Sequence, residues 1–189
     1  MDIQSLFLLF NFTFFVGGFV GGIGGVLLVP YLVFIFRLDA ATAVASTMFA
    51  YIFSGLAATF AYARMGSVKW PMVWPVCGAA APAAFLGSLT VWIVPGEILL
   101  AGIAALTIFS GYRTLRPPVN ARSDNKNIKT RALIAVGAIS GYISVLVGAG
   151  GAVVLIPLLF AMGAPALLTI GLSQAIHFVI AATATMGEL

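Results

Sequence analysis

The chain has 189 residues, of which 62% are hydrophobic and 7% are charged, and its formal net charge is +4. A soluble domain carries about 25% charged residues. The composition therefore excludes a soluble globular protein and predicts an all-α integral membrane protein with the lipid bilayer as its surroundings. Nucleic acid is not an expected partner, because most basic residues lie in one segment, 113–131, where membrane topology explains them.

Six apolar segments follow one another along the chain, and a helix needs about 20 such residues to cross the hydrocarbon of a bilayer. The segments are residues 5–36, 40–63, 70–94, 98–112, 132–160 and 167–186. The first is too long for one straight crossing. A plainly soluble stretch, 116–131, separates the fourth from the fifth. We therefore predict about six transmembrane segments.

The basic residues also predict the orientation of these segments. Cytoplasmic loops carry an excess of Lys and Arg, which places the 113–131 loop in the cytoplasm. Arg64 and Lys69 lie two crossings away and therefore on the same side. The connections on the other side hold Arg37 with Asp39, and Glu97 alone, and thus carry one basic residue between them.

Two glycine-rich stretches resemble each other: VGGFVGGIGGVLLVP, residues 16–30, and SVLVGAGGAVVLIP, residues 144–157. A shift of 127 residues superimposes glycines, prolines and hydroxyl side chains: Gly21 on Gly148, Gly24 on Gly151, Pro30 on Pro157, Thr42 on Thr169, and Ser46 on Ser173. We predict two pseudo-repeats, 1–115 with about four transmembrane segments and 132–189 with about two, joined by a basic loop, 116–131. Secondary transporters are commonly built from such repeats, with the substrate site between them.

The glycines themselves have two interpretations. Small residues four apart allow close packing of membrane helices, whereas a run as dense as 17–25 interrupts the helix, because each interior glycine costs about 1 kcal/mol. A half-helix that begins after the break, at about Gly24, would direct free N–H groups and a positive dipole end at an anion. The first segment is then either one broken helix or a re-entrant hairpin, and the repeats are parallel or inverted accordingly.

Polar residues follow each break. Thr42, Ser46 and Thr47 lie in the second segment, and Thr169, Ser173, Gln174 and His177 lie in the sixth. His177 is the single histidine of the chain. An ionisable residue in the middle of a membrane span is a candidate for function. Its two interpretations are a proton-carrying or anion-binding group and a neutral histidine that bridges two helices.

Nothing in the sequence indicates catalysis or a bound cofactor. Neither glycine stretch has the acidic residue that follows a dinucleotide-binding loop, and no GK[ST] occurs. Paired carboxylates, CxxC and multiple histidines are also lacking. We expect no catalytic residue, no metal and no cofactor, and hence no enzyme.

The order of these motifs resembles the TauE/SafE family of sulfite exporters and related anion permeases. The residues that carry the resemblance are GGFVGGIGGVLLVP and ATAVASTMFAYIFSG in the first half, GYRTLRP before the loop, and GAISGYISVLVGAGGAVVLIPLL and TIGLSQAIHFV in the second half. The resemblance implies transport of sulfite or small organic anions across a bacterial plasma membrane without ATP hydrolysis.

By position, the resemblance implies a substrate site with one half from each repeat. The first half is Gly21, Gly22, Gly24, Gly25, Thr42, Ser46 and Thr47, and the second half is Gly148, Gly150, Gly151, Thr169, Ser173 and Gln174. Family members usually have about four spans in each half, and the second half has two here. The alternative to a transporter is therefore a non-transporting membrane subunit or fragment, and a homo-oligomer or a completing subunit is the expected protein partner.

Overall fold

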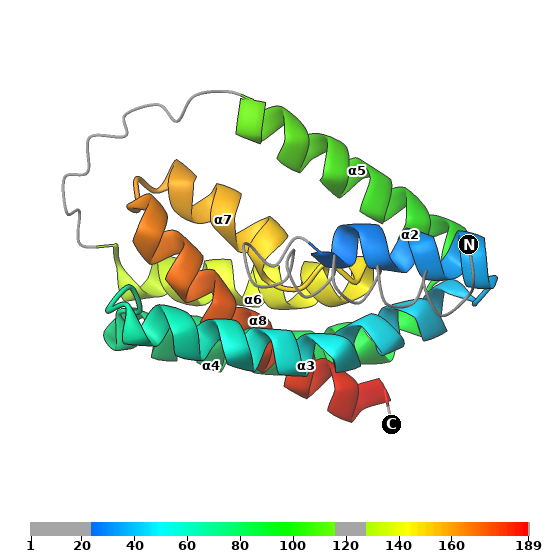
Figure 1. The fold of residues 1–189 in the computed structure, drawn as a ribbon, viewed down its shortest axis with the longest axis horizontal. Helices are drawn as coiled ribbons and strands as arrows, with labels where there is room; N and C mark the ends of the chain where they lie inside the picture. The colour runs from blue at the N-terminus through cyan, green and yellow to red at the C-terminus, as the bar shows by residue number, and fades with distance from the viewer. Residues whose placement is uncertain (1–23, 116–127, 189) are drawn as a thin grey trace.

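The described residues of the computed structural model, 24–115 and 128–188, form helices joined by short turns (Figure 1). The helices are α2 (Gly24–Phe36), α3 (Ala40–Arg64), α4 (Trp70–Val91), α5 (Gly96–Leu115), α6 (Thr130–Val147), α7 (Ala152–Ala161) and α8 (Ala166–Glu188). Within these residues there is no strand. The all-α prediction is confirmed for this part of the chain.

Local chemistry explains where the long helices begin. The Asp39 carboxylate caps α3 by accepting a hydrogen bond of 2.9 Å from the N–H of Thr42. This bond holds the pKa of Asp39 below its ordinary value of 3.8. Proline occupies the first turn of α4, at Pro71, where its missing N–H leaves no partner unpaired. The predicted segments 40–63 and 70–94 therefore agree with α3 and α4 to within a few residues.

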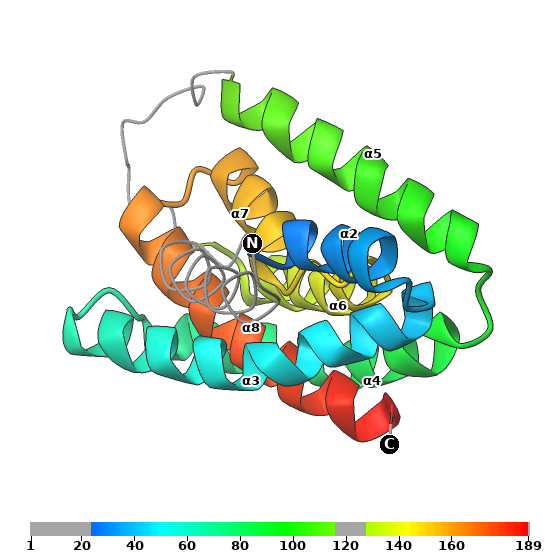
Figure 2. The same cartoon turned by 45° about the vertical axis from the view of Figure 1, so that its right-hand side comes forward.

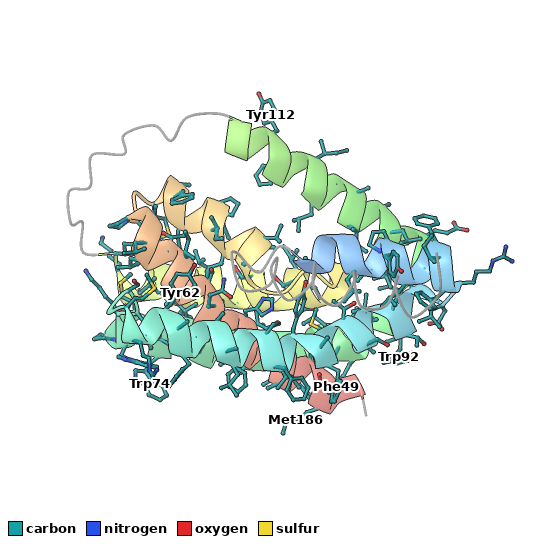
Figure 3. All side chains as sticks on the ribbon, viewed as in Figure 1. Phe49, Tyr62, Trp74, Trp92, Tyr112 and Met186 are labelled. Atoms are coloured by element: carbon teal, nitrogen blue, oxygen red, sulfur yellow. The ribbon has the colours of Figure 1, made fainter. Side chains whose placement is uncertain are left out.

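Four of the helices are long and apolar enough to cross a membrane: Ala40–Arg64, Trp70–Val91, Thr130–Val147 and Ala166–Gly187. Large apolar side chains point outward from them, as lipid-facing residues do, and Figure 3 shows Phe49, Trp74 and Met186 doing so. Six spans were predicted and four are identified. Of the other two, the first predicted segment lies mostly outside the described residues, and the fourth, 98–112, corresponds to α5, where the apolar helix Gly96–Leu106 is shorter than a full crossing.

The predicted crossing at 132–160 is wrong as a single crossing. Helices α6 and α7 meet at a break, residues 148–151, and α7 runs back in the opposite direction from α6 (Figure 1). At the break α7 lies beside Ile176 and Ile180, in the middle of α8, and its other end is joined to the start of α8. The ten residues of α7 span about 15 Å, half of the hydrocarbon thickness. The segment is a full crossing followed by a half-helix that returns.

Glycines bring α4 and α6 into direct contact. A Cβ on Gly137 would overlap the carbonyl of Val76, and one on Gly141 would lie 2.5 Å from the carbonyl oxygen of Ala80. Residue numbers rise together along the contact, so the two helices are parallel. The close approach of two backbones is the packing that small residues allow in membranes.

Helix α8 packs against both α3 and α4, but in opposite senses. Gly55 on α3 meets Phe178, whereas Ser67, just after α3, meets Gly171, so α3 and α8 are antiparallel. Gly187 at the end of α8 meets Ser88 near the end of α4, so those two helices are parallel. The beginnings of α4, α6 and α8 therefore lie at the same end of the molecule as Arg64.

The half-helices α2 and α7 lie in the middle of the molecule, between α5 on one edge and α3 and α4 on the other (Figures 1 and 2). Their first residues lie side by side in both views, and from there the two helices run in opposite directions. Gly148 supports this placement, because a Cβ there would lie 2.5 Å from Cγ2 of Val29 on α2. The break between α6 and α7 thus contacts the first half-helix.

The contact between α4 and α6 gives a matched test of the packing. Gly141→Ala should destabilise the protein by about 1–3 kcal/mol, because the added methyl group forces the two backbones apart. Gly78→Ala, on α4, should be neutral or stabilising by up to about 1 kcal/mol, because nothing lies within 4 Å of the new methyl group. Thermal unfolding of the detergent-solubilised variants measures both changes. Equal effects of the two substitutions would contradict the parallel α4–α6 contact.

Candidate functional site

The break between α6 and α7 is built by glycines in a conformation that other residues rarely adopt. Gly148 has φ of 64° and ends α6, and Gly150 has φ of 61°. Left-handed backbone costs a non-glycine residue about 1–2 kcal/mol. The N–H groups of Gly148 and Ala149 donate to carbonyls in the last turn of α6, so the end of that helix is satisfied.

The backbone N–H groups at the start of α7, in contrast, have no hydrogen-bond acceptor among the described residues. Gly151 is its N-cap residue and offers no side chain to the first turn. Among the described residues, no acceptor receives a hydrogen bond from the N–H groups of residues 150–154. These donors carry the positive end of the helix dipole. Unpaired backbone donors at this depth are tolerated only where they face protein or a polar cavity.

His177 lies directly against this start of α7. A Cβ on Gly150 would overlap Cε1 and Nδ1 of the His177 imidazole, so only glycine leaves room for the ring. From α3, the ring of Tyr51 approaches the imidazole edge-on, with ring centroids 4.1 Å apart. Gly55 lies one turn further along α3, and a Cβ on it would lie 3.1 Å from Cδ2 of His177. The imidazole is therefore held between α3 and the break.

Several polar side chains of α6 and α8 are fully buried and have no hydrogen-bond partner among the described residues. Both ring nitrogens of His177 and both amide atoms of Gln174 are buried and make no hydrogen bond with the described residues. The same holds for the hydroxyls of Ser140, Ser144 and Thr169. An unsatisfied buried polar group costs about 1–3 kcal/mol. A set of this size on neighbouring helices is typical of a site whose partner is a ligand or water.

Of the residues predicted in the second half, the structure brings two glycines and His177 together. Gly150 lies against the imidazole of His177, and Gly151 lies against the backbone nitrogen of His177. Gln174 lies one turn before His177 on α8. The Ser173 hydroxyl donates to the carbonyl of Ile170 and so bonds its own helix.

Gly148 and Thr169 complete that half. Gly148 lies against α2 and α3, not against the imidazole. Thr169 is buried in the first turn of α8, near the end at which α8 begins. That these residues bind substrate stays a prediction, as does the proton-carrying role of His177.

The predicted residues of the first half are placed differently. Thr47 is buried and its hydroxyl donates to the carbonyl of Ala43. Ser46 is exposed, and its hydroxyl donates to the carbonyl of Thr42. The hydroxyls of Thr47 and Ser46 thus both bond carbonyls of their own helix, α3. Two predicted glycines, Gly24 and Gly25, open the helix α2. The other two, Gly21 and Gly22, lie outside the described residues.

Sequence reasoning missed Tyr51 and Gly55. A tyrosine in a membrane span usually lies at the interface, where its hydroxyl reaches water. Tyr51 instead lies near the middle of α3, and this position could have predicted that its side chain is buried against another helix. Gly55 is four residues later and therefore on the same helix face. Together they form the surface of α3 on which the imidazole rests.

The chemistry available at this site is hydrogen bonding without a fixed charge. Within the described residues, no group of three His, Cys, Asp or Glu side chains could hold a metal ion. The described spans carry charged residues only at or next to their ends. Backbone N–H groups at a helix start, an amide and an imidazole can together replace the hydration of a small anion.

A family model described as "Sulfite exporter TauE/SafE" matches residues 6–188 of the chain. The match covers nearly the whole chain, including both glycine-rich stretches and the helices that follow them. Comparison with curated proteins found no match, and comparison with solved structures found none.

The contact between Gly150 and the imidazole can be tested against a matched glycine. Gly150→Ala and Gly163→Ala both place a methyl group on left-handed backbone, at φ of 61° and 78°, which costs about 1–2 kcal/mol. Nothing lies within 4 Å of the new methyl group at Gly163, whereas the one at Gly150 overlaps His177. Gly150→Ala should therefore lower the thermal stability of the detergent-solubilised protein by clearly more than Gly163→Ala. Equal losses would show that the imidazole does not occupy this position.

Proposed function

Since the chain belongs to the TauE/SafE sulfite exporter family, a family of membrane transporters, we propose that it is a secondary transporter of small anions such as sulfite or organosulfonates. The anion is proposed to bind at the start of α7, where it would accept hydrogen bonds from the unpaired N–H groups. The Gln174 amide and the His177 imidazole would complete its surroundings. None of these groups is proposed to act as a nucleophile, acid or base, because a transporter binds and releases its substrate unchanged.

The observation that carries the proposal is the coincidence of two kinds of unpaired group. The backbone donors of residues 150–154 and the side chains of Gln174 and His177 belong to different helices. Each would cost free energy if it stayed unpaired in a membrane. A bound anion would satisfy both at once, because it accepts hydrogen bonds and is attracted by the positive end of α7.

The second half of the site is proposed to come from the start of α2. Helices α2 and α7 are each followed, after a few residues, by a long helix, α3 and α8, and those long helices are antiparallel. An inverted repeat at an offset of 127 residues would give this arrangement. It would also place Gly24 and Gly25 opposite Gly151 across the substrate.

We expect Gln174→Met to separate binding from folding. Methionine has a similar volume and needs no hydrogen bond, so the variant should be more stable than the native chain by about 1–3 kcal/mol without an anion. It should also bind ³⁵S-labelled sulfite at least about ten-fold more weakly. Scintillation proximity on purified protein and uptake into proteoliposomes measure binding and transport.

The matched control is Thr185→Val on the same helix. The Thr185 hydroxyl donates to the carbonyl of Ala181 at 2.8 Å and so is already satisfied. This variant should leave both stability and sulfite binding nearly unchanged. Gln174→Met with native sulfite binding and uptake would reject this site, and absence of sulfite binding by the native chain would reject the function.

We also propose that the protein lies in a bacterial plasma membrane with the 113–131 loop in the cytoplasm. The geometry supports a common side for the basic residues, because α4 and α6 are parallel and begin next to Lys69 and Lys129. The native Cys77 is buried and can be replaced by alanine to leave a clean background. A cysteine at Lys129 should then react only after the membrane is permeabilised, and one at Glu97 should react in intact cells. The reverse pattern would overturn the orientation.

A further inference from the structure

The positive charges of this chain all lie away from the middle of its spans. The Lys and Arg residues are Arg37, Arg64, Lys69, Arg113, Arg116, Arg122, Lys126, Lys129 and Arg131. In the described helices such residues occur at or next to an end, as Arg64 does in α3 and Arg131 in α6. The sequence before Arg37 contains none. Within the part of the chain that the structure describes, no guanidinium or ammonium group is therefore available where α7 begins.

The groups that are available at the start of α7 are neutral donors and partial charges. The start of one helix carries about half of a positive elementary charge. The first described residues of α2 lie beside those of α7 (Figures 1 and 2), so a second helix start at this point would bring the total to about one positive charge. The Gln174 amide adds hydrogen bonds without net charge.

His177 does not change this balance. Its ring nitrogens have no acceptor among the described residues, and the aromatic group against it is Tyr51. The carboxylates of the chain are Asp2, Asp39, Glu97, Asp124 and Glu188, none of which lies in the middle of a described helix. Among the described residues, no carboxylate is therefore placed to stabilise an imidazolium at this position, and the ring acts as a neutral hydrogen-bonding group.

From this charge balance we infer that the site selects oxyanions by their charge: it accepts singly charged tetrahedral anions and rejects doubly charged ones of the same size. The inference rests on the proposed function and adds a substrate class to it. The cost of removing an ion from water grows with the square of its charge, so a dianion costs about four times as much as a monoanion of equal radius. About one compensating positive charge suits a monoanion and leaves a dianion with an unpaired charge in a medium of low dielectric constant.

Methanesulfonate and sulfate are the matched probes for this inference. Both are tetrahedral sulfur oxyanions with a fixed charge at neutral pH, and they differ by a methyl group in place of one charged oxygen. The full chain, purified in detergent, is expected to bind ³⁵S-labelled methanesulfonate in a scintillation proximity assay. Sulfate is expected to bind at least about ten-fold more weakly, and to displace methanesulfonate only at correspondingly higher concentration.

The outcomes distinguish the inference from the function beneath it. Equal binding of the two anions would overturn the charge selection and leave the anion site in place. Binding of neither anion would overturn the proposed function and the inference together.

Discussion

The structure depends on one constraint: a backbone N–H group in the hydrocarbon of a membrane must find an acceptor. Each long helix meets this constraint along its length, but the start of α7 does not, because Gly148–Gly151 reverses the chain in the interior. The left-handed conformation of Gly148 and Gly150 makes the reversal sterically cheap. Among the described residues, the reversal leaves the N–H groups at the start of α7 without acceptors, and the buried side chains of Gln174 and His177 also have no hydrogen-bond partner. The break is therefore the place where an anion would gain the most from binding.

Close packing around the break keeps this arrangement in position. Gly137 and Gly141 let α6 lie directly on α4, and Gly55 lets α3 approach α8 at the level of His177. A side chain at any of these positions would separate two backbones. The same residue type thus has two roles in this protein: in the long helices it allows contact, and at the break it allows reversal. Both roles were predicted as alternatives for the first glycine stretch, and the glycines in the second half of the chain have both.

Hydropathy and glycine density were sufficient to predict the long helices and the position of the second break, because both depend on local composition. They were not sufficient to predict the direction of α7, since an apolar half-helix of ten residues has the same composition whether it continues or returns. The polar residues show the same division. Gln174 and His177, which were predicted as site residues, are buried, whereas the exposed Ser46 and the Tyr51 contact depend on how α3 packs against α8. That packing is a tertiary property which one sequence does not reveal.

The central claim, that an anion binds beside His177 at the start of α7, can be tested most directly by nuclear magnetic resonance of the imidazole. The chain contains a single histidine, so protein labelled with ¹⁵N-histidine reports one ring without ambiguity. Titration of the detergent-solubilised chain with methanesulfonate should shift the ring nitrogen resonances in a saturable manner, and Gln174→Met should weaken the titration by at least about ten-fold. Ring resonances that do not move at methanesulfonate concentrations that saturate binding would place the anion elsewhere and contradict the account.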